Sequence, residues 1–153
     1  MKELLQSSDL ETLEKLFEQE REVELPPAAS YKGSYLKRLQ NKGANKPWFS
    51  IPQALLFEFT PFGINFAKET GDWFFLNPAF QLGRFSMKIG PSRWRNTTVV
   101  QLHYEVSSIP EPVKGLLYDE IKPVGKGRYL GIGGANLEKD QGDHFFFLLE
   151  RLN

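Results

Sequence analysis

Apolar and polar residues alternate along much of the chain, and a period of two predicts strands rather than helices. The clearest case is 100–106, where apolar side chains occupy the even positions and polar ones the odd positions. The stretch 85–89 alternates in the same way. Two apolar stretches, 64–66 and 73–76, flank a polar loop at 69–72 and predict a hairpin.

Two further segments precede this hairpin. Residues 54–59 predict a strand that ends before Pro61. Residues 31–36 either begin a strand or form a short helical turn, and the pattern leaves both open.

The C-terminal third, 116–152, is the most apolar part of the chain. It predicts strands at 116–121, 129–132 and 144–149. Because the last of these holds three consecutive Phe followed by two Leu, we expect both of its faces to be buried. Counted with the upstream strands, these make about eight, joined by short turns. The sequence therefore predicts a mainly β fold, an antiparallel sheet that closes or nearly closes into a barrel.

One amphipathic helix precedes the strands. Ser8 and Glu11 fit a capping box, and apolar residues then recur at helical spacing, which predicts a helix over 9–20. Its apolar stripe packs on the sheet, plugs a barrel mouth or binds a partner helix. Pro26 and Pro27 stop the helical pattern and start an extended connector.

Length and composition restrict the class of protein. A chain of 153 residues is expected to form one domain, with the helix and its connector in 1–24 and the barrel in 25–153. Basic and acidic residues number 19 each, and this balance disfavours nucleic acid as a partner. The apolar runs are shorter than a membrane helix, so we expect no stable membrane insertion and a cytoplasmic protein. The absence of cysteine excludes disulfides and thiolate metal sites, and nothing predicts a cofactor.

Few residues suggest chemistry. The two histidines, His103 and His144, are too few for a histidine metal cluster; we expect the first on a solvated strand face and the second at a turn edge. Asp119 and Glu120 are adjacent on a predicted strand, so they point to opposite faces. The one that faces the interior needs a cation opposite it, and Arg128 is the candidate.

Glycines at 131, 133 and 134 resemble those of phosphate-binding loops. Since no predicted helix follows and no lysine stands in the required place, we interpret them as bends of a barrel strand.

Arg93, Trp94 and Arg95 form the most unusual polar cluster. Two arginines around an indole can bind a phosphate, a carboxylate headgroup or a base. The alternative is a Trp94 that packs at the end of the barrel with the arginines at its rim.

The aromatic residues, 13 Phe, 5 Tyr and 3 Trp, either fill a β-rich core or line an apolar pocket. Strand alternation predicts that some of these rings face the interior as pocket liners: Phe57, Phe59, Phe66, Phe85, Tyr104 and Phe147.

Several short phrases occur together along the chain. In order, they are Leu25-Pro26-Pro27, Gly33-Ser34-Tyr35, Pro47-Trp48-Phe49, Leu76-Asn77-Pro78-Ala79, Leu117-Tyr118-Asp119, Tyr129-Leu130-Gly131 and the closing run 145–151. This series resembles the small bacterial and plant domain family named for a Gly-x-Trp-x-Gly motif. Tyr35 stands where that motif has its Trp, and Lys37 where it has its last Gly. Of the family's Asp-x-Phe-Arg phrase only an arginine, Arg128, remains.

The resemblance implies a lipocalin-like barrel more than an activity, since that family is largely uncharacterised. The C-terminal strands are also similar to those of plastid lipid-associated (fibrillin-type) proteins. Together with the aromatic strands, this favours non-catalytic binding of a small apolar or amphipathic ligand, such as a lipid, pigment or isoprenoid. Tyr35, Tyr118 and Asp119 are then further candidate contacts.

Two alternatives stay open. In the first, side chains fill the barrel and the protein serves as an interaction module that uses the helix stripe or an exposed aromatic edge. In the second, Asp119 and Tyr118 act as acid and base in an isomerase or cyclase. Nothing in the sequence predicts the oligomeric state.

Overall fold

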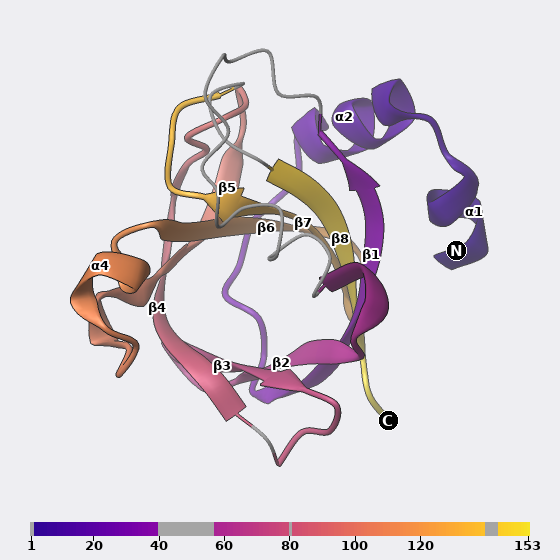
Figure 1. Cartoon of the computed structure of the whole chain (residues 1–153). Coiled ribbons are helices and arrows are strands. Elements are labelled where there is room, and N and C mark those ends of the chain that lie inside the picture. Colours follow the sequence, from indigo (N-terminus) through magenta and orange to yellow (C-terminus); the bar gives the residue numbers. More distant parts are fainter. Residues whose placement is uncertain (1, 40–56, 80, 140–143) are drawn as a thin grey trace.

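The computed structural model describes residues 2–39, 57–79, 81–139 and 144–153, and these form a closed β-barrel (Figure 1). Its eight strands are β1 (Ala29–Arg38), β2 (Phe62–Phe66), β3 (Thr70–Phe75), β4 (Gln81–Pro91), β5 (Thr98–His103), β6 (Leu117–Gly125), β7 (Arg128–Ala135) and β8 (His144–Arg151). The helices are α1 (Lys2–Ser7), α2 (Leu10–Glu18), the 3-10 turn η1 (Tyr104–Val106) and α4 (Glu111–Lys114).

The strands are arranged around the barrel in chain order, and every neighbouring pair is antiparallel. β8 returns to pair with β1 over seven registered positions, which closes the sheet. The predicted fold class, a closed antiparallel barrel of about eight strands, is confirmed. Residues 31–36, left ambiguous by their pattern, belong to β1.

The two ends of the barrel differ. We call the end that carries the β1–β2, β3–β4, β5–β6 and β7–β8 connections the mouth; it faces the viewer in Figure 1. At the other end, the connector 19–28 runs across the barrel before it enters β1 (Figure 1). Its Val23 and Leu25 pack against the interior core, so this end is covered from within the same chain.

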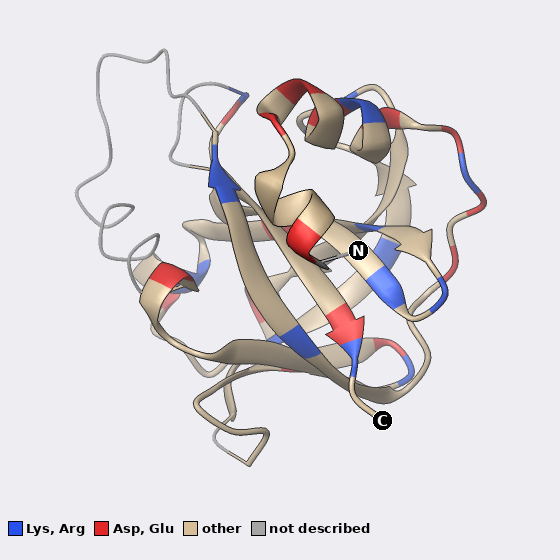
Figure 2. Cartoon of the chain, turned by 90° about the vertical axis from the view of Figure 1, so that its right-hand side faces the viewer, with Lys and Arg blue, Asp and Glu red and all other residues tan. Residues whose placement is uncertain are grey.

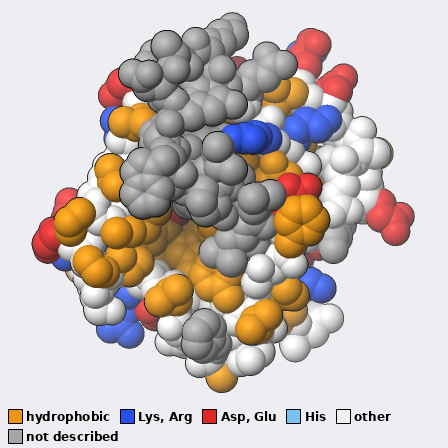
Figure 3. Space-filling view, in the orientation of Figure 1, with side chains coloured by type: hydrophobic (Ala, Val, Ile, Leu, Met, Phe, Trp, Pro, Cys, Tyr) orange, Lys and Arg blue, Asp and Glu red, His pale blue; other side chains and the backbone are white. Residues whose placement is uncertain are grey.

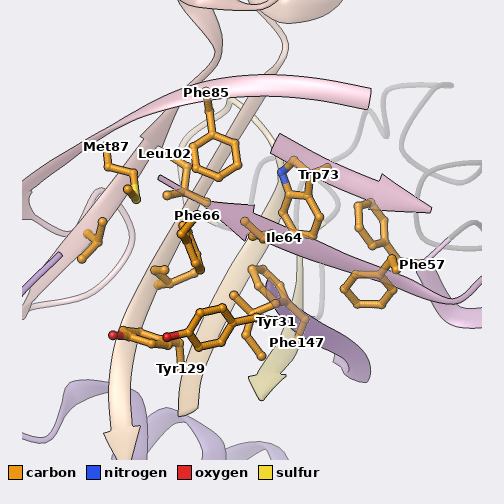
Figure 4. Packing of buried hydrophobic residues seen from close by; sticks show 14 of the residues in the cluster. Tyr31, Phe57, Ile64, Phe66, Trp73, Phe85, Met87, Leu102, Tyr129 and Phe147 are labelled. Atoms are coloured by element: carbon orange, nitrogen blue, oxygen red, sulfur yellow. The ribbon is translucent and has the colours of Figure 1, made fainter. Parts of the chain in front are cut away.

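Aromatic rings fill the interior beneath the mouth (Figure 4). Rings from strands that are not neighbours touch: Trp73 of β3 lies 5.6 Å from Phe147 of β8, between ring centroids. Edge-to-face contacts of this kind are favourable beyond the area they bury. The residues of this core are Tyr31, Phe57, Phe62, Ile64, Phe66, Trp73, Phe85, Met87, Val100, Leu102, Tyr104, Ile121, Tyr129, Phe145, Phe147 and Leu149.

A second apolar layer lies outside the barrel, between α1, α2 and strands β6 to β1 (Figure 2). Leu13 and Phe17 of α2 are fully buried, and the Phe17 ring meets Phe146 at 5.9 Å. The predicted helix therefore packs its stripe on the sheet, which leaves that stripe covered rather than open to a partner. Its N-cap is Asp9, which accepts a hydrogen bond from the Thr12 N–H, and not Ser8.

The double burial predicted for the last strand is confirmed. Every residue of 144–149 is buried, with odd positions facing the interior core and Phe146 and Leu148 facing the outer layer. β7 is buried in the same way.

Two expectations for secondary structure fail. In the predicted strand 54–59, residues 54–56 lie outside the described part of the chain and 57–59 are helical. The alternating stretch 100–106 stays a strand only to His103. It then turns as η1, and Val106 is exposed, because the chain must leave the sheet at the mouth.

Gly131 shows how closely the interior is packed. A Cβ at this position would overlap the ring of Phe147 on the neighbouring strand, whereas a Cβ at Gly125 would meet nothing within 4 Å. The glycine at 131 thus makes room for a ring instead of forming a bend.

We expect Gly131→Ala to lower the free energy of unfolding by about 1–3 kcal/mol, because the buried Phe147 ring must leave its position. Gly125→Ala is the matched control and is expected to change it by less than about 0.5 kcal/mol. Urea unfolding of both variants measures the difference. Equal stability of the two variants would contradict the packing described here.

Candidate functional site

A chain of three polar groups lies inside the aromatic core, close to the mouth. The Trp73 indole N–H donates to the hydroxyl of Tyr104, and that hydroxyl donates to Oδ2 of Asp119. The Gly134 N–H donates to Oδ1 of Asp119 at 3.3 Å. We call Trp73, Tyr104 and Asp119 the relay. It links β3, η1 and β6.

The local sequence explains why a carboxyl fits here. Asp119 pairs across the sheet with Gly133 of β7, and a Cβ at Gly133 would overlap the Asp119 carboxylate. Glycine therefore leaves the space in which the carboxylate turns inward. Gly134 has a φ of 140°, a conformation that side chains disfavour, and its N–H is one of the donors to Asp119.

Burial dominates the electrostatics of Asp119. It raises the pKa of this carboxyl to about 7, and the outward-facing Glu120 adds to the rise; the hydrogen bonds from Tyr104 and Gly134 oppose it. Burial and the neighbouring Asp119 raise the pKa of Tyr104 well above its ordinary value, so the phenol keeps its proton.

No counter-cation balances this carboxyl within the described part of the chain. None of the described Lys, Arg or His side chains forms an ion pair with Asp119 within 4.0 Å. The expected partner, Arg128, pairs instead with Glu150 on the outer face at 3.1 Å. That prediction was wrong because Arg128 lies at the opposite end of β7, on the other face of the sheet. A tyrosine hydroxyl takes the place of the cation.

Phe57 enters the same region from the mouth and not from a barrel strand. Its ring is surrounded by the rings of Phe62 at 4.8 Å, Trp73 at 5.2 Å and Phe145 at 5.0 Å. Figure 4 shows it beside the Trp73 indole. The mouth thus holds a planar apolar group inside an aromatic cage.

The mouth is apolar at its rim as well. Tyr35, Phe75 and Leu117 are half-buried and pack against the core, and Tyr35 stacks on Phe145 with centroids 5.6 Å apart. Figure 3 shows hydrophobic side chains around and within a hollow on this face. Large exposed apolar side chains on the connections at this end, and Leu82 at the start of β4, form what we call the apolar rim. Those on the connections are Phe59, Leu76, Val106, Val113 and Leu116.

The predicted pocket liners divide into three groups. The interior contains Tyr35, Phe57, Phe66, Phe85, Tyr104, Asp119 and Phe147. Phe59 is 76% exposed and does not line the interior, because 57–59 is helical and only Phe57 points inward. The remaining predicted residues, Arg93, Trp94, Arg95, Tyr118 and Arg128, lie on the outer face of the barrel.

The cluster at 93–95 holds the outer layer together. The Trp94 indole N–H donates to the Leu137 carbonyl at 2.8 Å, and its ring lies 4.2 Å from that of His144. Arg95 makes a two-pronged ion pair with Glu14 of α2. The expected alternative was a Trp94 that packs at the end of the barrel with the arginines at its rim. Trp94 is a packing residue, but its ring lies in the outer layer and not at the end of the barrel.

Glu120 is the outward counterpart of Asp119, which confirms that the two carboxyls point to opposite faces. It accepts hydrogen bonds from Ser92, from the Arg93 N–H and from the Tyr118 hydroxyl. Burial raises its pKa, and these bonds oppose the rise. The Tyr118 hydroxyl therefore hydrogen bonds to Glu120 on the outer face, while Asp119 faces the interior. The predicted acid–base pair of Asp119 with Tyr118 is not formed.

Outside the barrel, a groove of about 600 Å³ follows β5 and β6. Its lining includes Arg93, His103, Tyr104, Lys114 and Tyr118. His103 is half-buried there, and burial lowers its pKa. The other histidine, His144, is buried and hydrogen bonds to the Ala135 carbonyl at 2.8 Å, so neither lies on a fully solvated edge.

The relay shows what alternation alone missed. Trp73 stands in the apolar run 73–75, where either face could be the inner one, so the sequence did not single it out. Gly133 opposite Asp119 was the available signal, since a glycine in a strand indicates that a neighbour approaches closely.

Among the described residues, no three His, Cys, Asp or Glu side chains gather as metal ligands. Over the same residues, the search for a helix of membrane-spanning length and hydropathy finds none. Comparisons of the chain with protein-family models, with curated proteins and with solved structures find no match. The resemblance to the Gly-x-Trp-x-Gly family therefore stays a prediction.

The raised pKa of Asp119 makes stability depend on pH. Between its ordinary value of 3.8 and about 7, the folded protein holds a proton that the unfolded chain has released, so stability falls as pH rises. We expect wild type to lose about 3 kcal/mol more than Asp119→Asn between pH 5 and pH 8, because asparagine reproduces the protonated carboxyl. Urea unfolding at the two pH values measures this.

Glu120→Gln is the matched control for this comparison. Glu120 accepts three hydrogen bonds, so we expect this variant to change the pH dependence less than Asp119→Asn does. The assignment fails if the pH dependence of Asp119→Asn equals that of wild type.

Proposed function

We propose that this chain binds a small, mainly apolar ligand in the mouth of its barrel, with the relay holding the polar group of that ligand. The observation that carries the proposal is the Asp119 carboxyl, placed inside an aromatic core with no cation among the described residues to balance it. Burying such a group costs free energy, and its two donors, the Tyr104 hydroxyl and the Gly134 N–H, are both uncharged, so they leave the charge of the carboxylate unmatched. Sites that bind small molecules combine apolar walls with a few directed polar groups in this way.

The position of Phe57 supports the same function. Its ring already occupies an aromatic cage, and it is delivered by a short segment at the mouth. A ligand with a ring or a short alkyl chain makes the same contacts when it takes the place of this side chain or lies beside it. Phe57 then competes with the ligand and lowers its apparent affinity.

Phe57→Ala tests this competition. We expect the variant to bind a neutral hydrophobic fluorophore such as Nile red more tightly than wild type, because the cage is vacant. We also expect its free energy of unfolding to fall by about 3–5 kcal/mol, the usual effect of removing a buried ring. Fluorescence titration and native mass spectrometry of freshly purified protein measure binding and co-purified ligand.

Phe59→Ala is the matched control, since Phe59 is two residues away and exposed. It should change neither stability nor binding. Phe57→Leu keeps the cage partly filled in case the alanine variant does not fold. The proposal is wrong if wild type, Phe57→Ala and Phe57→Leu all bind no probe and carry no ligand.

A protein-docking function is the second candidate, and the apolar rim is the observation that favours it. The six large apolar side chains of this rim are exposed, and exposed apolar patches often mark interaction sites. In that case the aromatic contacts inside the barrel stabilise the fold and do not form a binding site. A barrel that is ligand-free in native mass spectra and in which no Phe57 variant binds a probe would favour this candidate.

A further inference from the structure

We propose that the polar group of the ligand is a protonated amine, held between the Asp119 carboxylate and the aromatic rings around it. This inference rests on the proposed function and specifies its ligand class. It follows from two independent features of the mouth: the charge of the relay and the chemistry of its walls.

The first feature is the unmatched carboxylate. Oδ2 of Asp119 accepts from Tyr104 and Oδ1 from Gly134, and neither donor is charged. Each carboxylate oxygen has a second lone pair, so one more donor can be accepted. A cationic donor satisfies both the hydrogen-bonding capacity and the charge, and charge-assisted hydrogen bonds are the stronger kind.

The second feature is the surrounding rings. Trp73, Phe145 and Phe147 lie near the carboxyl. Trp73 donates to the Tyr104 hydroxyl that in turn donates to Asp119, and ring atoms of Phe147 and Phe145 would lie 3.2 Å and 3.4 Å from a Cβ placed at Gly133, next to Oδ1 of Asp119. The faces of aromatic rings carry negative potential and attract ammonium groups, most strongly where water is excluded. An aromatic cage beside a carboxylate is therefore complementary to an alkylammonium group.

An anionic ligand does not fit this arrangement. A carboxylate placed beside Asp119 meets a like charge in a site of low polarity, which is costly. The arginines that were candidates for an anionic headgroup face outward, where Arg93 pairs with Glu138 and Arg95 with Glu14. Arg38 stands on β1 at the mouth, opposite Phe145, so a ligand carboxylate bound near the rim is the main competing arrangement.

Among the described groups packed around Asp119, the Asp119 carboxyl is the one whose charge changes between pH 5.5 and pH 8. β7 contributes glycines, β8 contributes Phe145 and Phe147, and β3 contributes Trp73. Its titratable neighbours in the described part of the chain are Tyr104, which stays neutral, and Glu120, which faces outward. The pKa of Asp119, about 7, implies that amine binding strengthens as pH rises from 5.5 to 8, where the carboxyl loses its proton and an alkylamine keeps its own.

Three ligands with one alkyl chain test the inference: hexylamine, hexanol and hexanoate. Their affinities are measured at pH 8 by displacement of Nile red from Phe57→Ala, the variant with the vacant cage, and by calorimetry on wild type. We expect hexylamine to bind about tenfold more tightly than hexanol, and hexanoate to bind most weakly. At pH 5.5 the advantage of the amine over the alcohol should shrink to about twofold or less.

Asp119→Asn, made in the same background, separates charge from shape. It should weaken hexylamine by about tenfold and change hexanol by about twofold or less, since asparagine keeps the size and loses the charge. Glu120→Gln, the outward-facing match, should change neither affinity. Should Asp119→Asn not fold, the pH dependence of the amine advantage in the parent protein tests the same charge.

The possible results separate the two proposals. Binding of hexanol and hexanoate as tight as that of hexylamine, or an amine affinity that Asp119→Asn leaves unchanged, overturns the amine inference and leaves the binding function standing. If hexanoate binds best and Arg38→Met abolishes this, the ligand is anionic and the inference is wrong. If Nile red binds but none of the three ligands displaces it or binds to wild type, the amine inference fails and the binding function stands. If Nile red does not bind to any variant and no ligand co-purifies, both proposals fail.

Discussion

The pairing of β8 with β1 is the constraint on which the rest of this structure depends. An open eight-stranded sheet leaves two unpaired edges, and closure satisfies their backbone groups within the chain. Closure also turns the alternation of each strand into an inside and an outside. Because β7 and β8 are buried on both faces, the barrel needs an outer cover over these strands, and α2 supplies it with Leu13 and Phe17. The N-terminal helix is therefore part of the fold and not an appendage.

Much of this architecture could be predicted from the sequence. The triple phenylalanine run predicted a strand buried on both faces, and the amphipathic stripe predicted a helix packed on the sheet. Both predictions succeeded because hydrophobic burial acts locally and its period is readable. Other predictions from the same patterns failed where the chain connects one strand to the next. Phe59 and Val106 continue an apolar pattern, yet both are exposed where the chain turns away from the barrel. Alternation shows which residues of a strand lie on the same face, but it does not show where the strand ends.

The candidate site was harder to predict for a different reason. Asp119 was singled out, but the other members of the relay come from β3 and η1, and no pattern along the chain joins Trp73, Tyr104 and Asp119. The choice of Arg128 followed from the rule that buried carboxyls need cations. A tyrosine hydroxyl and a backbone N–H satisfy the hydrogen bonds of this carboxyl, and its charge is left unmatched. Similarly, Tyr118 is adjacent in sequence to Asp119 but lies on the other side of the sheet wall.

The interior glycines have a consequence for how this barrel can change. Gly33 faces the ring of Phe62, Gly71 that of Phe85 and Gly131 that of Phe147, so each of these three interior rings lies over a glycine of the neighbouring strand. The ring occupies the space that a side chain at the glycine position would need. A smaller side chain in place of the ring permits a larger one in place of the glycine, and the neighbouring strand then fills the same volume while every backbone hydrogen bond is kept. The interior of such a barrel can thus be repacked by paired substitutions on neighbouring strands, with no insertion and no shift of register.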